Sequence, residues 1–182
     1  MSPPFAKGRL GGIMIEVILF DLGNVILPFN HYQIAEKLSR FSLEAELRDP
    51  PKIFSHLFDF QNGAVNLYET GKISSLQFFQ SLKERFRLSL SLDEFIPIWN
   101  DIFWENVEVS EIIRSLKGKK RLGLLSNTNP LHFDYILSKF PIVQIFDKWI
   151  LSHEVGFKKP VLEIFQKAIE WASVEPEKIL FI

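Results

Sequence analysis

Asp21, at the end of an apolar segment, is a candidate catalytic or metal-binding residue. Residues 17–20 are all apolar, Asp21 follows them directly, and Gly23 lies in the turn beyond. A continuous apolar run is typical of a buried parallel strand, and parallel sheets bind ligands beyond the carboxyl ends of their strands. Asp21 is therefore a candidate nucleophile or metal ligand, although a carboxylate here is also typical of a residue that caps the next turn.

Two later segments carry polar groups at comparable places. Ser126 and Asn127 follow a second apolar segment, and Lys159 stands directly before a proline after a third. Since the carboxyl ends of parallel strands share one edge of a sheet, we expect these groups to converge on Asp21. A hydroxyl, a backbone amide and an ammonium group can hold a phosphoryl group that a carboxylate attacks. Taken singly, Ser126-Asn127 is as typical of a capped turn, and Lys158-Lys159 of a solvated pair.

The elements that would position these groups alternate along the chain. Apolar segments predict strands within 13–27, at 122–125, at 149–151 and from 178 to 182. Helical spacing of apolar residues predicts helices at 31–41, 53–60, 76–86, 92–103, 108–116, 131–139 and 161–171, with Asn30, Ser74 or Ser75, and Ser91 as N-caps. Alternating strands and helices predict an α/β fold with a Rossmann-like, parallel, three-layer core.

One part of the chain holds more helices than this core needs. A crossover between parallel strands requires one helix, whereas residues 30–106 predict several. We therefore predict a core from 13–29 and 107–182, with residues 30–106 as an inserted helical cap over the strand ends. An elaborated crossover packed on the sheet is the alternative. Residues 1–12, rich in Pro, Gly and basic side chains, are expected to be a flexible leader.

Composition narrows the function further. The 182 residues are 47% hydrophobic, enough for a sizeable core, and the net charge of −1 argues against a nucleic-acid partner. The absence of Cys excludes disulfides and thiolate metal sites. No segment is apolar for long enough to span a membrane. We expect a cytoplasmic protein that acts on a small molecule; the oligomeric state is left open.

These motifs together resemble the haloacid dehalogenase-like hydrolases, a superfamily made up mostly of phosphatases. The segment Asp-Leu-Gly-Asn-Val at 21–25 is similar to the branch that contains bacterial α-glucose-1-phosphate phosphatases, and Gly-Lys-Ile-Ser at 71–74 is similar to a turn in that branch's helical cap. The resemblance implies Asp21 as nucleophile, Ser126 and Asn127 as phosphate-holding residues, and Lys159 as the catalytic, phosphate-binding lysine of the third motif. It also implies Mg²⁺, for which the Asp21 carboxylate and the Gly23 carbonyl are suitable hard ligands.

The chain departs from the family pattern at two places. Gly23 stands where most members carry a second aspartate that serves as general acid and base, a role typically worth about 10²–10⁴-fold in rate. The acidic pair of the fourth motif would follow the strand at 179–182, where the sequence ends. We therefore expect a C-terminally truncated core, incomplete as written, that binds Mg²⁺ weakly and is inactive or slow.

The predicted function is a Mg²⁺-dependent phosphatase of small phosphorylated metabolites, with a sugar phosphate as the expected substrate and an aspartyl-phosphate on Asp21 as the intermediate. Asn30 and His31 begin the helical segment and are candidate substrate contacts. A degenerate domain that binds a phosphorylated ligand without turnover is the alternative. A 2-haloacid dehalogenase ranks below both, because that chemistry needs a halide-binding arginine and none lies between Asp21 and Arg40.

Overall fold

The sheet is built from four short strands in the part of the chain that is described. The computed structural model describes residues 14–59 and 61–182, so the leader predicted at 1–12 lies outside the described residues. The strands are β1 (Val17–Phe20), β2 (Arg121–Ser126), β3 (Lys148–Leu151) and β4 (Ile179–Phe181). They are parallel and lie in the order β3-β2-β1-β4, so β1 has a neighbour on each side. All four residues of β1 are buried, as a continuous apolar run predicts.

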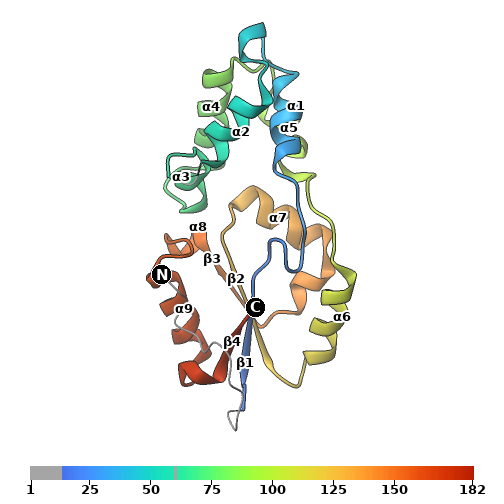
Figure 1. Cartoon of the computed structure of the whole chain (residues 1–182), viewed down its shortest axis with the longest axis vertical. Coiled ribbons are helices and arrows are strands. Elements are labelled where there is room, and N and C mark those ends of the chain that lie inside the picture. The colour runs from blue at the N-terminus through green and yellow to red at the C-terminus, as the bar shows by residue number, and fades with distance from the viewer. Residues whose placement is uncertain (1–13, 60) are drawn as a thin grey trace.

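Helices cover both faces of this sheet (Figure 1). Alternate β1 residues point to opposite faces: Val17 and Leu19 pack with α9 (Leu162–Ala172), whereas Ile18 and Phe20 pack with the other face's cluster. That second face is covered by α6 (Val107–Leu116) and α7 (Pro130–Lys139). The predicted three-layer α/β fold is therefore confirmed.

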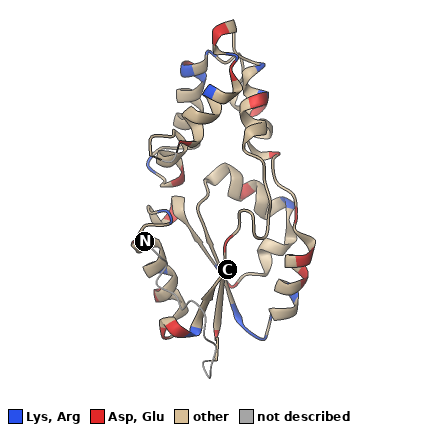
Figure 2. Cartoon of the chain, viewed as in Figure 1, with Lys and Arg blue, Asp and Glu red and all other residues tan. Residues whose placement is uncertain are grey.

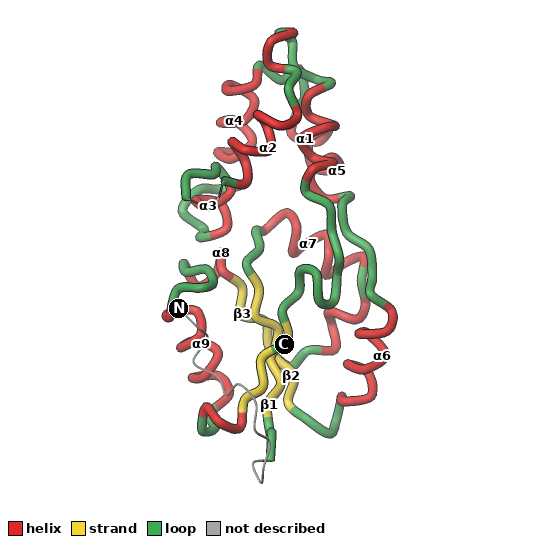
Figure 3. The backbone as a smooth tube through the Cα atoms, in the orientation of Figure 1, coloured by secondary structure: helices red, strands yellow, loops and turns green. Residues whose placement is uncertain are grey.

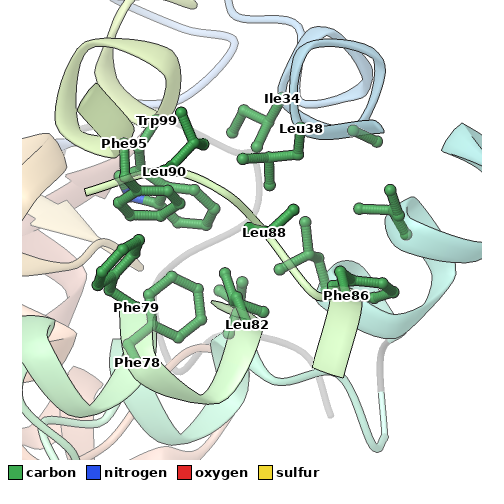
Figure 4. Close-up of a cluster of buried hydrophobic side chains, with 14 of the residues drawn as sticks. Ile34, Leu38, Phe78, Phe79, Leu82, Phe86, Leu88, Leu90, Phe95 and Trp99 are labelled. Carbon is green, nitrogen blue, oxygen red and sulfur yellow. The ribbon is translucent and has the colours of Figure 1, made fainter. Parts of the chain in front are cut away.

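The remaining helices gather beyond the carboxyl edge of the sheet, where two chain segments join them to it (Figure 3). We call these helices the helical bundle: α1 (Tyr32–Ser39), α2 (Pro50–Phe58), α3 (Val65–Glu69), α4 (Ser75–Phe86) and α5 (Leu92–Asn100). The bundle has a hydrophobic core of its own, in which aromatic rings pack among leucine and isoleucine side chains (Figure 4). Phe78 stacks on Tyr68 and meets Trp99 edge to face at 4.9 Å between ring centroids. Many of the chain's 18 phenylalanines serve this second core.

Two helices begin after the serines predicted to cap them, whereas α2 begins at Pro50, three residues before its predicted start, with Asp49 as its N-cap. Ser74 and Ser91 each form a capping box with the residue three positions later. Asn30, predicted as the N-cap of α1, does not have that position, because α1 starts one residue later than predicted, after His31. The Asn30 side chain instead accepts a hydrogen bond from the Tyr32 amide at 3.0 Å. The short helices α3 and α8 (Ser152–Val155) were not predicted, because segments this short carry little periodicity.

His132 of α7 joins the bundle to the sheet layers. Its Nε2 lies 2.9 Å from the Trp99 carbonyl oxygen, which can only accept, so Nε2 carries the proton. Nδ1 then accepts from the Asn129 amide at 3.1 Å, and the Asn129 oxygen accepts from the Trp99 indole at 3.2 Å. The imidazole is satisfied only in its neutral form, and burial lowers the pKa of His132 to about 3.

We predict that His132 stays neutral well below the pH at which an ordinary histidine becomes charged. The unfolded chain takes up this proton near pH 6.5, whereas the folded chain takes it up near pH 3. The stabilisation is therefore complete above about pH 6.5 and is lost progressively as pH falls from there toward 3. The NMR signal of His132, assigned by its loss in His132→Gln, is expected not to shift between pH 8 and 5. A titration midpoint near 6.5 would contradict this assignment.

Candidate active site

Asp21 and Lys159 form an ion pair at the carboxyl edge of the sheet. Lys159 Nζ lies 2.6 Å from Asp21 Oδ2, and the lysine side chain is only 14% exposed. The same Nζ donates to the Leu125 carbonyl at 2.9 Å, while Asp21 Oδ1 accepts from the Leu22 amide at 2.7 Å. Burial lowers the pKa of Lys159, and the Asp21 carboxylate opposes that effect. The pair thus holds one carboxylate in a defined orientation with a cation beside it.

Asn127 fixes the backbone of Lys159. Its side-chain oxygen accepts from the Lys159 amide at 2.7 Å, and its side-chain nitrogen donates to the Lys159 carbonyl at 3.0 Å. Both ends of the amide are therefore committed to the lysine segment. Ser126 precedes it at the end of β2, is buried, and its hydroxyl donates weakly to the Asn127 carbonyl at 3.3 Å. The two residues predicted to hold phosphate thus lie next to the predicted lysine, with the Asn127 side chain positioning that lysine.

In the turn after β1, a side chain at Gly23 would require the Phe29 ring to move. A Cβ atom built there would lie 2.6 Å from the Phe29 ring. Asn24, the next residue, adopts a left-handed conformation with φ of 59°, which asparagine tolerates better than most residues. The Phe29 ring therefore lies where the second acidic side chain of this motif would begin.

A small cavity of about 40 Å³ opens between this edge and the helical bundle. Ser126, Asn127 and Gly23 contribute to it from the sheet side, and Glu69 from the end of α3. Of the two predicted substrate contacts, His31 lines the cavity and Asn30 does not. Burial lowers the pKa of His31 to about 4, so this ring is neutral at pH 7. The complete lining is Leu22, Gly23, Phe29, His31, Glu69, Phe103, Ser126, Asn127, Thr128, His132 and Ile136.

Glu69 and Lys158 tie the bundle to the segment that carries Lys159. Lys158 Nζ lies 3.1 Å from Glu69 Oε2 and also donates to the Asn66 side chain. Burial raises the pKa of Glu69, and Lys158 counters that rise. Lys158 is therefore not solvated as the interpretation of Lys158-Lys159 as a solvated pair predicts, and Glu69 was not among the predicted site residues. The nearby Gly-Lys-Ile-Ser turn marks this segment, but which side chain points to the core depends on tertiary packing.

Asp21 and Gly23 provide part of the oxygen ligand set that a hard metal ion needs. Asp21 provides a carboxylate and Gly23 a backbone carbonyl in the turn after β1, both oxygen donors of the kind that Mg²⁺ selects. Mg²⁺ is commonly held by one or two carboxylates, with water and phosphate oxygens completing its shell. Within residues 14–59 and 61–182, no group of three or more His, Asp or Glu side chains is arranged to bind a metal. Any cation here would therefore depend on ligands besides these side chains.

Charge elsewhere on the chain is mixed. Figure 2 shows acidic and basic residues interspersed over the helices of both parts of the molecule. Among the described helices, none combines the length and the apolar character that crossing a bilayer requires.

The sequence is similar to a known family of hydrolases and to individual phosphatases. Residues 15–182 match the sequence model of the haloacid dehalogenase-like hydrolases. The chain is 29% identical to a D-ribitol-5-phosphate phosphatase of Bacteroides thetaiotaomicron over 93% of its own length and 82% of that protein's. It is 27% identical to a pyrimidine 5'-nucleotidase of Escherichia coli, over 86% of this chain and 71% of that one.

Solved structures show the same fold. A haloacid dehalogenase family enzyme of Bacteroides thetaiotaomicron superposes with a TM-score of 0.80 at 25% identity, covering 92% of this chain and 83% of that one. The same enzyme has been crystallised with magnesium and inorganic phosphate, and that complex superposes with a TM-score of 0.78 at 24% identity over the same shares of the two chains. Because the family match covers nearly all of the sequence, the chain belongs to the haloacid dehalogenase-like hydrolases.

Proposed function

We propose that this hydrolase is a phosphatase of small phosphorylated metabolites that works through an aspartyl-phosphate on Asp21. The observation that carries the proposal is the Asp21–Lys159 pair, with 2.6 Å between its charged atoms, beside Ser126 at one edge of the sheet. Relatives whose names specify phosphate esters support the same reaction class. A sugar or polyol phosphate is the substrate type that we infer.

The reaction has two displacement steps. An Asp21 oxygen attacks phosphorus, a bond to phosphorus forms, and the bond to the ester oxygen breaks; the leaving alkoxide takes a proton from water. Water then attacks the phosphorus of the acyl-phosphate, which releases inorganic phosphate and restores the carboxylate. Lys159, the Ser126 hydroxyl and the Asn127 backbone amide would offset charge on the phosphoryl oxygens. Mg²⁺ bound by the Asp21 carboxylate and the Gly23 carbonyl would supply further charge neutralisation.

Gly23 limits which esters react quickly. With the Phe29 ring against Gly23, no carboxylic acid stands two residues after the nucleophile to protonate the leaving oxygen. Esters whose leaving oxygen is only weakly basic, such as an anomeric oxygen, suffer least from that loss. The missing general acid at Gly23 also favours the alternative function, in which the chain binds a phosphorylated ligand without turnover.

The helical bundle is inferred to act as a cap over this site, with residues 30–106 as the inserted domain and 13–29 with 107–182 as the core. The cavity of about 40 Å³ is far smaller than the several hundred Å³ that usually hold a small-molecule ligand. Substrate entry would therefore require the bundle, which two chain segments join to the sheet layers (Figure 3), to move away from the sheet edge.

We predict that Asp21→Asn lowers phosphatase turnover by at least about 10³-fold, because an amide oxygen is a poor nucleophile. The measurement is phosphate release from a panel of sugar and polyol phosphates. Asp134→Asn, which changes an exposed carboxylate on α7, is the matched control and should keep wild-type rates. Unchanged turnover in Asp21→Asn would disprove the nucleophile assignment.

Metal dependence distinguishes the proposed phosphatase activity from the 2-haloacid dehalogenase activity that the same fold can support. An aspartate that displaces halide from carbon needs no cation, whereas phosphoryl transfer is strongly helped by one. We predict that EDTA reduces phosphate release by tenfold or more and that added Mg²⁺ restores it. Halide release from 2-chloropropionate that persists in EDTA would favour the dehalogenase instead.

A further inference from the structure

We propose that Glu69 is a specificity-determining residue that restricts the leaving group to an uncharged, hydroxyl-bearing moiety. This inference rests on the proposed phosphatase function and names the substrate class of the same site. Glu69 ends α3, lines the same cavity as Ser126 and Asn127, and belongs to the bundle and not to the sheet layers. It would therefore meet the part of the substrate that lies beyond the phosphoryl group.

The charge of the cavity lining supports this assignment. Glu69 is the one carboxyl side chain among the described residues that line the cavity, and Lys158 at 3.1 Å favours its charged form, whereas burial keeps His31 and His132 neutral. The other lining groups are aromatic rings, aliphatic side chains and uncharged polar groups. No cation within this lining would neutralise a carboxylate or a second phosphate on the leaving group.

Both neighbouring lysines are already paired with protein groups, Lys158 with Glu69 itself and Lys159 with Asp21. Lys158 contacts Glu69 Oε2 and the Asn66 side chain, and it is not part of the lining. Lys159 is held against Asp21 and the Leu125 carbonyl, at the place where the phosphoryl group would bind. Glu69 Oε1 has no partner among the described residues. This oxygen can accept hydrogen bonds from substrate hydroxyl groups, and it would repel an anionic leaving group.

Two pairs of substrates test this inference, because each pair differs only in a hydroxymethyl group against a carboxylate. They are ribitol 5-phosphate with ribonate 5-phosphate, and glycerol 3-phosphate with 3-phosphoglycerate. We expect wild-type kcat/KM to favour the neutral member of each pair by roughly tenfold or more. In Glu69→Gln this preference should largely disappear, mainly through faster turnover of the acids. Glu36→Gln, which alters an exposed carboxylate on α1, should keep it.

Binding measurements separate this inference from the phosphatase proposal. The Kd values of the same four compounds are measured by calorimetry on Asp21→Asn. If nothing is hydrolysed but the neutral compounds still bind better in a Glu69-dependent way, the phosphatase proposal fails and the role of Glu69 stands. Hydrolysis with equal efficiency for neutral and acidic members, or an unchanged preference in Glu69→Gln, overturns the role of Glu69 alone.

Glu69→Gln leaves Lys158 without its carboxylate and risks destabilising the fold. The double variant Glu69→Gln, Lys158→Met removes both charges and keeps similar side-chain volumes. It should likewise lose the preference for neutral leaving groups. A folded double variant that keeps the wild-type preference overturns the inference.

Discussion

The ion pair between Asp21 and Lys159 is the interaction on which the proposed chemistry depends. An isolated ammonium group as buried as that of Lys159 would lose much of its hydration without compensation. Here each group has further partners: the Leu22 amide on one side and the Leu125 carbonyl on the other. Asn127 then holds the lysine backbone through two hydrogen bonds. The ends of β1 and β2 and the segment that carries Lys159 are thereby joined in one network, and the sheet register determines where the nucleophile lies.

The strand ends could be predicted from sequence because parallel pairing leaves little freedom. The apolar runs before Asp21 and Ser126 predict buried strands, and parallel strands necessarily place their carboxyl ends together. Lys159 was assigned over Lys158 by its place before a proline. In the structure Lys159 contacts Asp21, while Lys158 contacts Glu69. Adjacent lysines of identical chemistry thus differ because successive side chains leave the backbone in different directions.

The residues that come from the helical bundle could not be predicted in the same way. Whether Glu69 or a neighbour meets the core depends on how the bundle sits on the sheet edge, and no periodicity encodes that. The position of the Phe29 ring against Gly23 could not be predicted either, because the loop between the two residues has an irregular backbone. His132 was not among the residues predicted from the sequence. Its burial follows from the contact of α7 with Trp99 on α5, which is visible only in three dimensions.

Two physically different parts divide the work that the proposed reaction requires. The sheet edge holds the groups that act on phosphorus, and their positions follow from hydrogen-bonded strand pairing, which tolerates little movement. The bundle brings Glu69 and His31 to the same cavity on a separate aromatic core. Because most of that core comes from the bundle's own helices, the bundle can change its surface residues while the nucleophile stays in place. Substrate choice could therefore change in this fold without rebuilding the chemistry, provided that the link through Lys158 is kept or replaced.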